Sequence, residues 1–134
     1  MKSCSFFGHR DTPQTEELKQ KVRETVERLI VEDGVDTFLF GSRSSFDDLC
    51  LLVVTELKKK YPHIKRVYVR LQYLHIDNLY KEYLLGFYDD TIMPQRVESA
   101  RKASYAERNQ EMIGASDFCV FYYNPCYLLP KRKY

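Results

Sequence analysis

The sequence predicts an α/β fold, an open parallel sheet with helices on both of its faces. Three observations carry this prediction. Short apolar segments alternate with longer helix-like segments, the first two apolar segments each end at a glycine, and the last one shows no polar alternation. Strands that alternate with helices are typical of parallel sheets, whose strands are buried on both faces. The length of 134 residues, with 44% hydrophobic residues, fits one domain over residues 1–134.

The first strand and the first helix have clear boundaries. Residues 4–7 are a short, mostly apolar run that ends at Gly8, which is typical of a strand followed by a turn. The run 11–13 (Asp-Thr-Pro) is a helix-start signature, and the helix itself is expected over residues 15–33. Within it, leucine, valine and isoleucine recur every three or four residues, and Gly34 stands where a helix commonly ends.

The second strand and helix follow the same pattern. Residues 37–40 are wholly apolar and again end at a glycine. Either Ser44 or Ser45 can cap the helix that follows, because a serine hydroxyl accepts hydrogen bonds from the first unpaired N–H groups. Residues 49–54 are apolar on every face, so this helix is expected to be deeply buried, and Pro62 ends it.

The second half of the chain is harder to interpret. Residues 64–71 predict a third strand and residues 97–115 a long helix, with a short helix expected within residues 79–85. The run 118–123 predicts a fourth strand that is buried on both faces.

Together these elements predict a three-layer, Rossmann-like sheet with a strand order of about 3-2-1-4. Ligands of such sheets bind outside the carboxyl ends of the strands, where the strand order reverses. The ligand crevice is therefore expected between the ends of the first and fourth strands. Asn124 follows the fourth strand and is a candidate contact.

The turn after the second strand is the most informative candidate site. It reads Gly41-Ser42-Arg43-Ser44 and leads directly into a helix N-terminus. Glycine allows close backbone approach, serines donate hydrogen bonds, and the arginine adds a fixed positive charge, which together would hold a phosphate or a carboxylate. An ordinary strand–helix turn, whose serines only cap the helix, explains the same residues equally well.

The turn after the first strand, Gly8-His9-Arg10, suggests a second anion contact. His9 could act as a general base, as a hydrogen-bond donor or as a helix cap. Arg10 suits an anionic ligand, although an ion pair with Asp11 or Glu16 explains it as well.

Arg108 and Asn109 are candidates in the middle of the long fourth helix. Arg108 lies on the same helical face as Arg101, Tyr105 and Met112. The face either lines the solvent or turns its arginines inward to the site.

Cysteine usage predicts neither a metal site nor a disulfide framework. The four cysteines, at positions 4, 50, 119 and 126, form no CxxC pair, and the three histidines are scattered. Buried thiols in a reducing compartment are expected instead, with Cys126 as an incidental loop thiol.

Charge and hydropathy disfavour nucleic acid and membranes as partners. The net charge is +2, but three positive residues lie among the last four, and the rest of the chain carries −1. A net charge of −1 provides no general field for a phosphate backbone. The chain shows no apolar run long enough to cross a bilayer and no signal peptide, so a cytoplasmic location is expected.

These motifs also resemble a known family. The segments that carry the resemblance are Phe6-Phe7-Gly8-His9-Arg10, Gly41-Ser42-Arg43 with Phe46-Asp47, Arg108-Asn109-x-x-Met112, and Ser116-Asp117 before an apolar strand. Over nearly the whole chain they resemble the YpsA-like branch of the SLOG superfamily. Its members are Rossmann-like domains related to the DNA-processing protein DprA and to the LOG-type phosphoribohydrolases.

The resemblance implies a nucleotide or a nucleotide-derived, phosphate-bearing ligand, for example one like ADP-ribose. The implied ligand contacts are Gly8, His9 and Arg10 after the first strand, residues 41–44 with Asp47 in the second turn, and Arg108 with Asn109 on the helix. The resemblance supplies no reaction, because most members of this branch have none assigned.

The sequence departs from the family pattern in two respects. Ser42 stands where relatives have a second glycine. Relatives also continue past the position of Tyr134 into a phosphate-binding turn, a helix and a further strand, and the PGGxGTxxE signature that supplies the phosphoribohydrolases' catalytic glutamate is absent. A domain shortened in this way would leave the fourth strand as an exposed edge, so self-association through that edge is expected.

Four functions are consistent with the sequence. The leading one is a cytosolic sensor or carrier that binds a nucleotide derivative. The first alternative is a hydrolase of N-glycosidic or phosphate linkages, with His9 or Asp47 as acid–base residue. A DprA-like binder of single-stranded nucleic acid is disfavoured by charge, and in a purely structural module Arg10, Arg43 and Arg108 would only form ion pairs.

Overall fold

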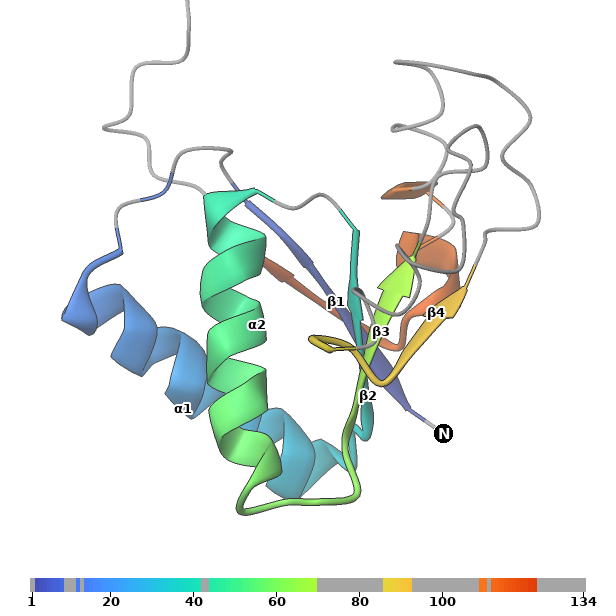
Figure 1. The fold of residues 1–134 in the computed structure, drawn as a ribbon, viewed down its shortest axis with the longest axis horizontal. Coiled ribbons are helices and arrows are strands. Elements are labelled where there is room, and N and C mark those ends of the chain that lie inside the picture. Colours follow the sequence, from blue (N-terminus) through green and yellow to red (C-terminus); the bar gives the residue numbers. More distant parts are fainter. Residues whose placement is uncertain are drawn as a thin grey trace, which may run out of the picture.

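A parallel sheet of five strands forms the centre of the fold (Figure 1). The computed structural model describes residues 2–8, 12, 14–41, 44–69, 86–92, 109–110 and 112–122. Within these residues the strands are β1 (Ser3–Phe7), β2 (Thr37–Phe40), β3 (Lys65–Val69), β4 (Asp90–Ile92) and β5 (Phe118–Phe121), and the helices are α1 (Glu16–Asp33) and α2 (Ser45–Lys58).

The strands lie in the order β4-β3-β2-β1-β5, and every neighbouring pair is parallel. Without β4 this is the predicted order 3-2-1-4, so the predicted α/β class and topology are confirmed. Strand β4 was not predicted, because a three-residue strand is too short to show a period in the sequence. The third and fourth strands are also shorter than the predicted runs 64–71 and 118–123.

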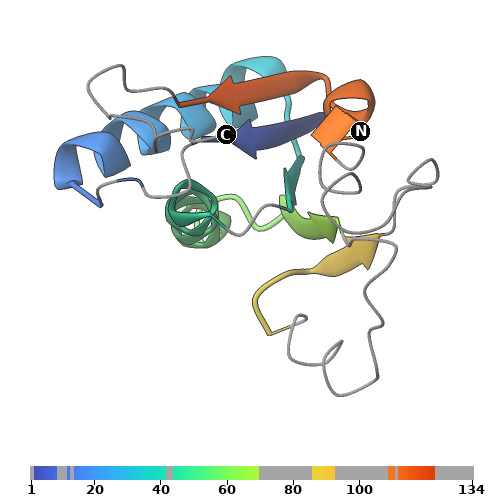
Figure 2. The same cartoon turned by 90° about the horizontal axis from the view of Figure 1, so that it is seen from above.

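Strand β5 corrects one prediction. The apolar run was expected to be buried on both faces, but three of its residues are only half-buried and Phe121 is 65% exposed. Among the described residues β5 pairs with β1 alone, at the edge of the sheet (Figure 2). An edge strand lacks one neighbour, so a purely apolar sequence there does not imply full burial.

Helix α1 begins and ends at capping residues. The Thr15 hydroxyl accepts a hydrogen bond from the N–H of Leu18 at 3.1 Å and caps the helix, in agreement with the predicted range 15–33. Gly34 closes it in the left-handed conformation, with φ of 71°, and donates its N–H to the Leu29 carbonyl. A side chain would be strained at that φ, which explains the glycine.

Helix α2 was expected to be buried on every side of residues 49–54, and this is only partly correct. Leu49, Cys50, Val53 and Val54 are buried, but Leu52 is 47% exposed. The helix lies on the surface of the sheet beside α1 and has no partner among the described residues on its outer side. Within the apolar run 49–54, the outward position Leu52 therefore reaches the solvent.

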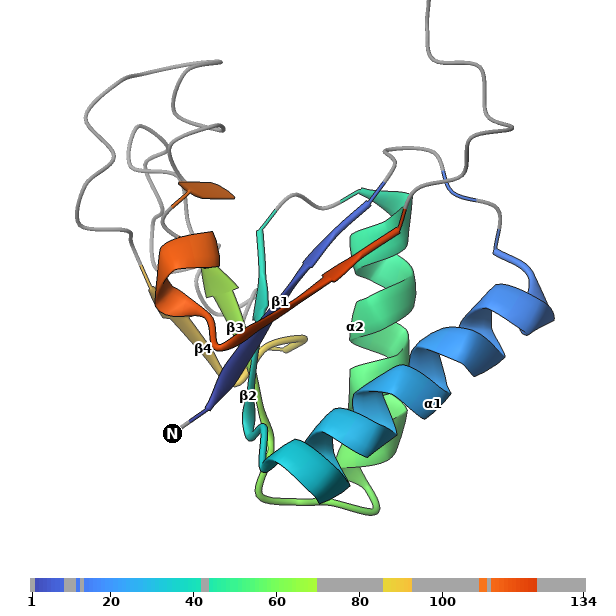
Figure 3. The same ribbon diagram turned by 180° about the vertical axis from the view of Figure 1, so that it is seen from behind.

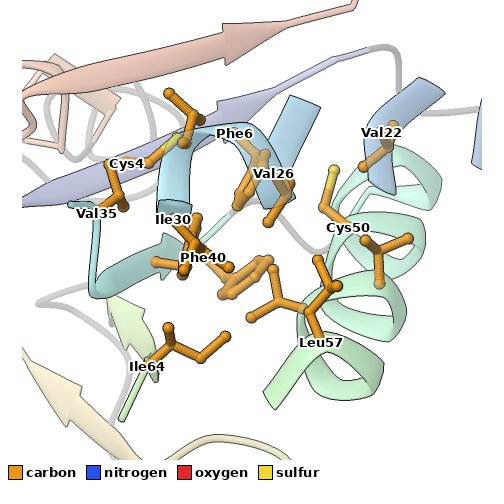
Figure 4. Packing of buried hydrophobic residues seen from close by; sticks show 14 of the residues in the cluster. Cys4, Phe6, Val22, Val26, Ile30, Val35, Phe40, Cys50, Leu57 and Ile64 are labelled. Carbon is orange, nitrogen blue, oxygen red and sulfur yellow. The ribbon is translucent and has the colours of Figure 1, made fainter. Parts of the chain in front are cut away.

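Both helices cover the same face of the sheet, as Figures 1 and 3 show. Right-handed crossovers between successive parallel strands that advance in one direction place their helices on one side. The main core lies between these two helices and the sheet (Figure 4), and Phe6 stacks there on both Phe38 and Phe40. Cys4 and Cys50 are fully buried in it, in agreement with the expected role of the cysteines.

The opposite face carries a smaller core of Leu39, Val67, Val69 and Met112, with Phe7 packed against it. Met112 belongs to the helical residues 109–110 and 112–115, which are the described portion of the predicted helix 97–115. The remainder of that helix and the predicted helix within 79–85 lie outside the described residues. In the part of the chain that is described, no helix is both long and apolar enough to cross a membrane.

Candidate functional site

The carboxyl ends of β1 and β2 both meet the first turn of α2, residues 44–47. Each of these four residues makes a different contact. Ser44 caps the helix, Ser45 holds the loop that follows β1, Phe46 packs on the end of β1, and Asp47 holds the end of β2. This turn is therefore the structural centre of the candidate site.

Asp47 fixes the turn that follows β2. Its Oδ2 accepts a hydrogen bond from the N–H of Gly41 at 3.1 Å, and its own N–H donates to the Ser44 Oγ at 3.2 Å. All three residues are buried. Gly41 and Ser44, the residues on either side of positions 42–43, are thereby both held by Asp47.

Gly8 ends β1 in direct contact with Phe46. A Cβ at Gly8 would lie 2.5–2.7 Å from three atoms of the Phe46 side chain, far below ordinary contact distance. Phe46 is 1% exposed and stacks on Tyr122, with ring centroids 5.4 Å apart. Tyr122 in turn donates its N–H to the Phe7 carbonyl at 2.9 Å. The ends of β1 and β5 are thus joined through Phe46 to the first turn of α2.

Thr12 and Gln14 connect the loop after β1 to the same turn. The Thr12 N–H donates to the Ser45 Oγ at 3.1 Å, and the Gln14 side-chain amide donates to the carbonyls of Ser45 (3.1 Å) and Thr12 (3.3 Å). Sequence reasoning missed Thr12 and Gln14 as site residues and did not connect Ser45 with the loop after β1. The contacts of Thr12 and Gln14 with Ser45 join residues more than 30 positions apart, and no spacing in the sequence indicates them.

The charge of Asp47 affects a neighbouring thiol. Burial first, and the Asp47 carboxylate second, raise the pKa of Cys50 well above its usual value. Burial also raises the pKa of Cys4, to about 12. Both thiols stay protonated at neutral pH, so neither is a candidate nucleophile at this site.

A second helical segment packs on the opposite face of the sheet, through Met112. The hydroxyls of Ser3 and Ser5 donate to the carbonyls of Ala115 (2.9 Å) and Met112 (3.4 Å). The helical residues 112–115 therefore run in the opposite direction to β1. Asn109 belongs to the same helical stretch.

The structure therefore brings together four of the predicted site residues, Gly8, Gly41, Ser44 and Asp47. Asn109 is described as helical and is not part of these contacts. His9, Arg10, Ser42, Arg43, Arg108 and Asn124 lie outside the described residues. Among the described residues, no group of three or more histidine, cysteine, aspartate and glutamate side chains could hold a metal ion.

A comparison with protein-family models gives one result for this chain. Residues 3–128 match the family model YpsA, described as the YspA SLOG family. This range covers all seven helices and strands described above. A search of curated proteins found no match.

Proposed function

We propose that this chain, which belongs to the YspA SLOG family, binds a nucleotide or a nucleotide-derived, phosphate-bearing ligand as a cytosolic sensor or carrier. The observation that carries the proposal is the convergence of the ends of β1 and β2 on the first turn of α2. Ligands of open parallel sheets bind at this edge. The buried free thiols of Cys4 and Cys50 are consistent with a reducing compartment.

The N-terminus of α2 supplies the polarity that an anion needs. The partial positive charge of a helix start favours a phosphate there. The sequence adds Arg43 in one adjoining turn and Arg10 in the other. Two arginines that flank one helix start would complement a ligand with more than one negative charge.

The position of Asp47 favours binding over hydrolysis. Its carboxylate is 3% exposed, and one of its oxygens accepts the Gly41 N–H. A general acid or base must reach the reacting atoms of the substrate. A buried carboxylate that holds the backbone of the adjoining turn fits a positioning role better, which leaves His9 as the main candidate for the alternative, a nucleotide-processing hydrolase.

The proposal predicts that nucleotides stabilise the protein through Arg43. A thermal-shift panel would contain AMP, ADP-ribose, NAD, cyclic nucleotides and ribose phosphates. A ligand at about 100 times its dissociation constant adds roughly 2.7 kcal/mol, which is several degrees of melting temperature at this size. The shift is expected in the wild type and expected to disappear in Arg43→Ala.

Arg28→Ala is the matched control, because Arg28 is an exposed arginine on α1. It should retain the full shift. If no compound in the panel stabilises the wild type, or if Arg43→Ala responds like the wild type, the proposed function is wrong.

We also propose that two copies associate through the edge formed by β5. Phe121 is 65% exposed there and stacks on Phe7, with ring centroids 5.4 Å apart. Light scattering at ~100 μM, far above the dissociation constant of an obligate dimer, is expected to show a dimer. Phe121→Lys should give a monomer, because a lysine on an edge strand opposes pairing.

Val31→Lys is the control for this prediction, since Val31 is 62% exposed on α1. It should leave the dimer intact. A wild-type monomer at that concentration would contradict the proposed association.

A further inference from the structure

The loop between β1 and α1 contacts the first turn of α2 at two residues, Gly8 and Thr12. Gly8 packs on Phe46, and Thr12 donates its N–H to Ser45. The chain is therefore held to one helical turn on both sides of residues 9–11. The turn after β2 is held at that same place by Asp47.

We propose that Ser45 and Gln14 are positioning residues, which hold the loop after β1, at Thr12, against the first turn of α2, where Asp47 also holds the turn after β2. The contacts of these two residues with the loop, namely Thr12 N–H to Ser45 Oγ and Gln14 Nε2 to the carbonyls of Thr12 and Ser45, are called the loop clamp below. The consequence of the clamp for ligand binding rests on the proposed function, but its consequence for the loop does not.

The hydroxyl of Ser45 is not needed to start the helix. Ser44 already caps α2, since its Oγ accepts the Asp47 N–H and its carbonyl accepts the Asp48 N–H at 2.9 Å. The Ser45 hydroxyl instead points to a loop residue 33 positions earlier in the chain. Ser44 therefore caps the helix, whereas the adjacent Ser45 connects the helix start to the loop after β1.

Gln14 strengthens the same connection from the side of the loop. Its side-chain amide has two N–H groups. The two acceptors are the carbonyls of Thr12 and Ser45, the same residues that the Thr12–Ser45 hydrogen bond joins. Thr12 is only 6% exposed, so water does not readily replace its contacts. A ligand that must contact both turns at once would lose affinity if the loop were released, because binding would then include the entropy of ordering it.

The test compares Ser45→Ala, Ser45→Thr and Gln14→Ala with the wild type in two measurements. Hydrogen exchange of the Thr12 amide reports on the loop without any ligand. Titration with the nucleotide that gives the largest thermal shift reports on binding. Thr25→Ala is the matched control, because it removes a hydroxyl that donates to the Lys21 carbonyl within α1.

Ser45→Ala is expected to speed exchange of the Thr12 amide about tenfold and to weaken nucleotide binding by the same factor. A tenfold change corresponds to the loss of one hydrogen bond of ordinary strength. Gln14→Ala should act in the same direction without altering the helix. Ser45→Thr keeps a hydroxyl acceptor and should restore both values, and Thr25→Ala should change neither.

The two measurements separate this proposal from the proposed function. If the wild type binds a nucleotide and both Ser45→Ala and Gln14→Ala bind it equally well, the positioning role is wrong. If the wild type binds no compound in the panel, the proposed function fails, and unchanged Thr12 exchange in Ser45→Ala would then overturn the loop clamp as well. If Ser45→Ala does not fold, Gln14→Ala decides by the same criteria.

Discussion

Replacing Gly8 by alanine is expected to lower the free energy of unfolding by about 1–3 kcal/mol, the usual range for adding atoms to a filled core. The new Cβ would lie 2.5–2.7 Å from three atoms of the Phe46 side chain, which is 1% exposed and stacked on Tyr122. One of the three atoms is the Phe46 Cβ, so rotating the ring does not relieve the contact. Thermal unfolding would show the loss as a drop of roughly 3–5 °C for each kcal/mol at this size.

Two further variants isolate the cause. Gly114→Ala is the matched control, because a Cβ there meets nothing within 4 Å; in a helix, alanine is favoured over glycine by up to about 1 kcal/mol. It should stabilise the protein slightly. In a Phe46→Ala background, which lacks two of the three atoms that the new Cβ would meet, Gly8→Ala should cost less stability than in the wild type. An equal loss in both backgrounds would contradict a steric origin.

The contact with Phe46 gives Gly8 a different role from that of Gly34, although both residues follow a predicted element in the same way. Gly34 has a positive φ and needs freedom of the backbone, which its place after an amphipathic helix indicates in the sequence. Gly8 needs space for a side chain 38 positions away. The sequence predicts a glycine turn at each position, but only the structure distinguishes the two reasons.

Elements with local signals were predictable, and elements that depend on long-range packing were not. The stripe of Val22, Val26 and Ile30 predicted the buried face of α1, and Ser44 was one of two candidates for the cap of α2. The exposure of Leu52 was not predictable, because it depends on which elements lie next to α2. For the fourth strand the apolar run indicated burial on both faces, and only the comparison with the family pattern indicated an exposed edge. An apolar run shows that burial is possible, but not how many neighbours the element has.

The candidate site likewise has a part that local sequence signals predict and a part that depends on long-range packing. Gly41, Ser44 and Asp47 lie within seven residues of each other, so a strand–turn–helix pattern was enough to group them. The hydrogen bonds of Thr12 and Gln14 with Ser45 require the loop after β1 to lie beside the start of α2. The parallel pairing of β1 and β2, which places the ends of both strands at one edge of the sheet, brings these segments together. The hydrogen bonds of Asp47 with Gly41 and Ser44, in contrast, stay within one turn.

Replacing Asp47 by alanine is expected to cost about 1–3 kcal/mol of unfolding free energy and to weaken nucleotide binding at least tenfold, because a buried hydrogen-bond partner is lost. The Gly41 N–H would lose the carboxylate oxygen at 3.1 Å, and the turn that contains Arg43 would lose its link to the first turn of α2. Chemical denaturation measures the first effect, and ligand titration measures the second.

Asp47→Asn distinguishes a positioning role from an acid–base role. The amide oxygen of asparagine can still accept the Gly41 N–H, so binding and most of the stability should return if Asp47 only positions the turn. The amide cannot accept or release a proton as a carboxylate does. If the wild type hydrolyses a nucleotide and Asp47→Asn binds that nucleotide normally without hydrolysing it, Asp47 is a catalytic residue and the binding module is an enzyme. If Asp47→Asn retains both binding and any turnover while Asp47→Ala loses both, Asp47 acts through the Gly41 N–H, and the search for an acid–base residue moves to His9.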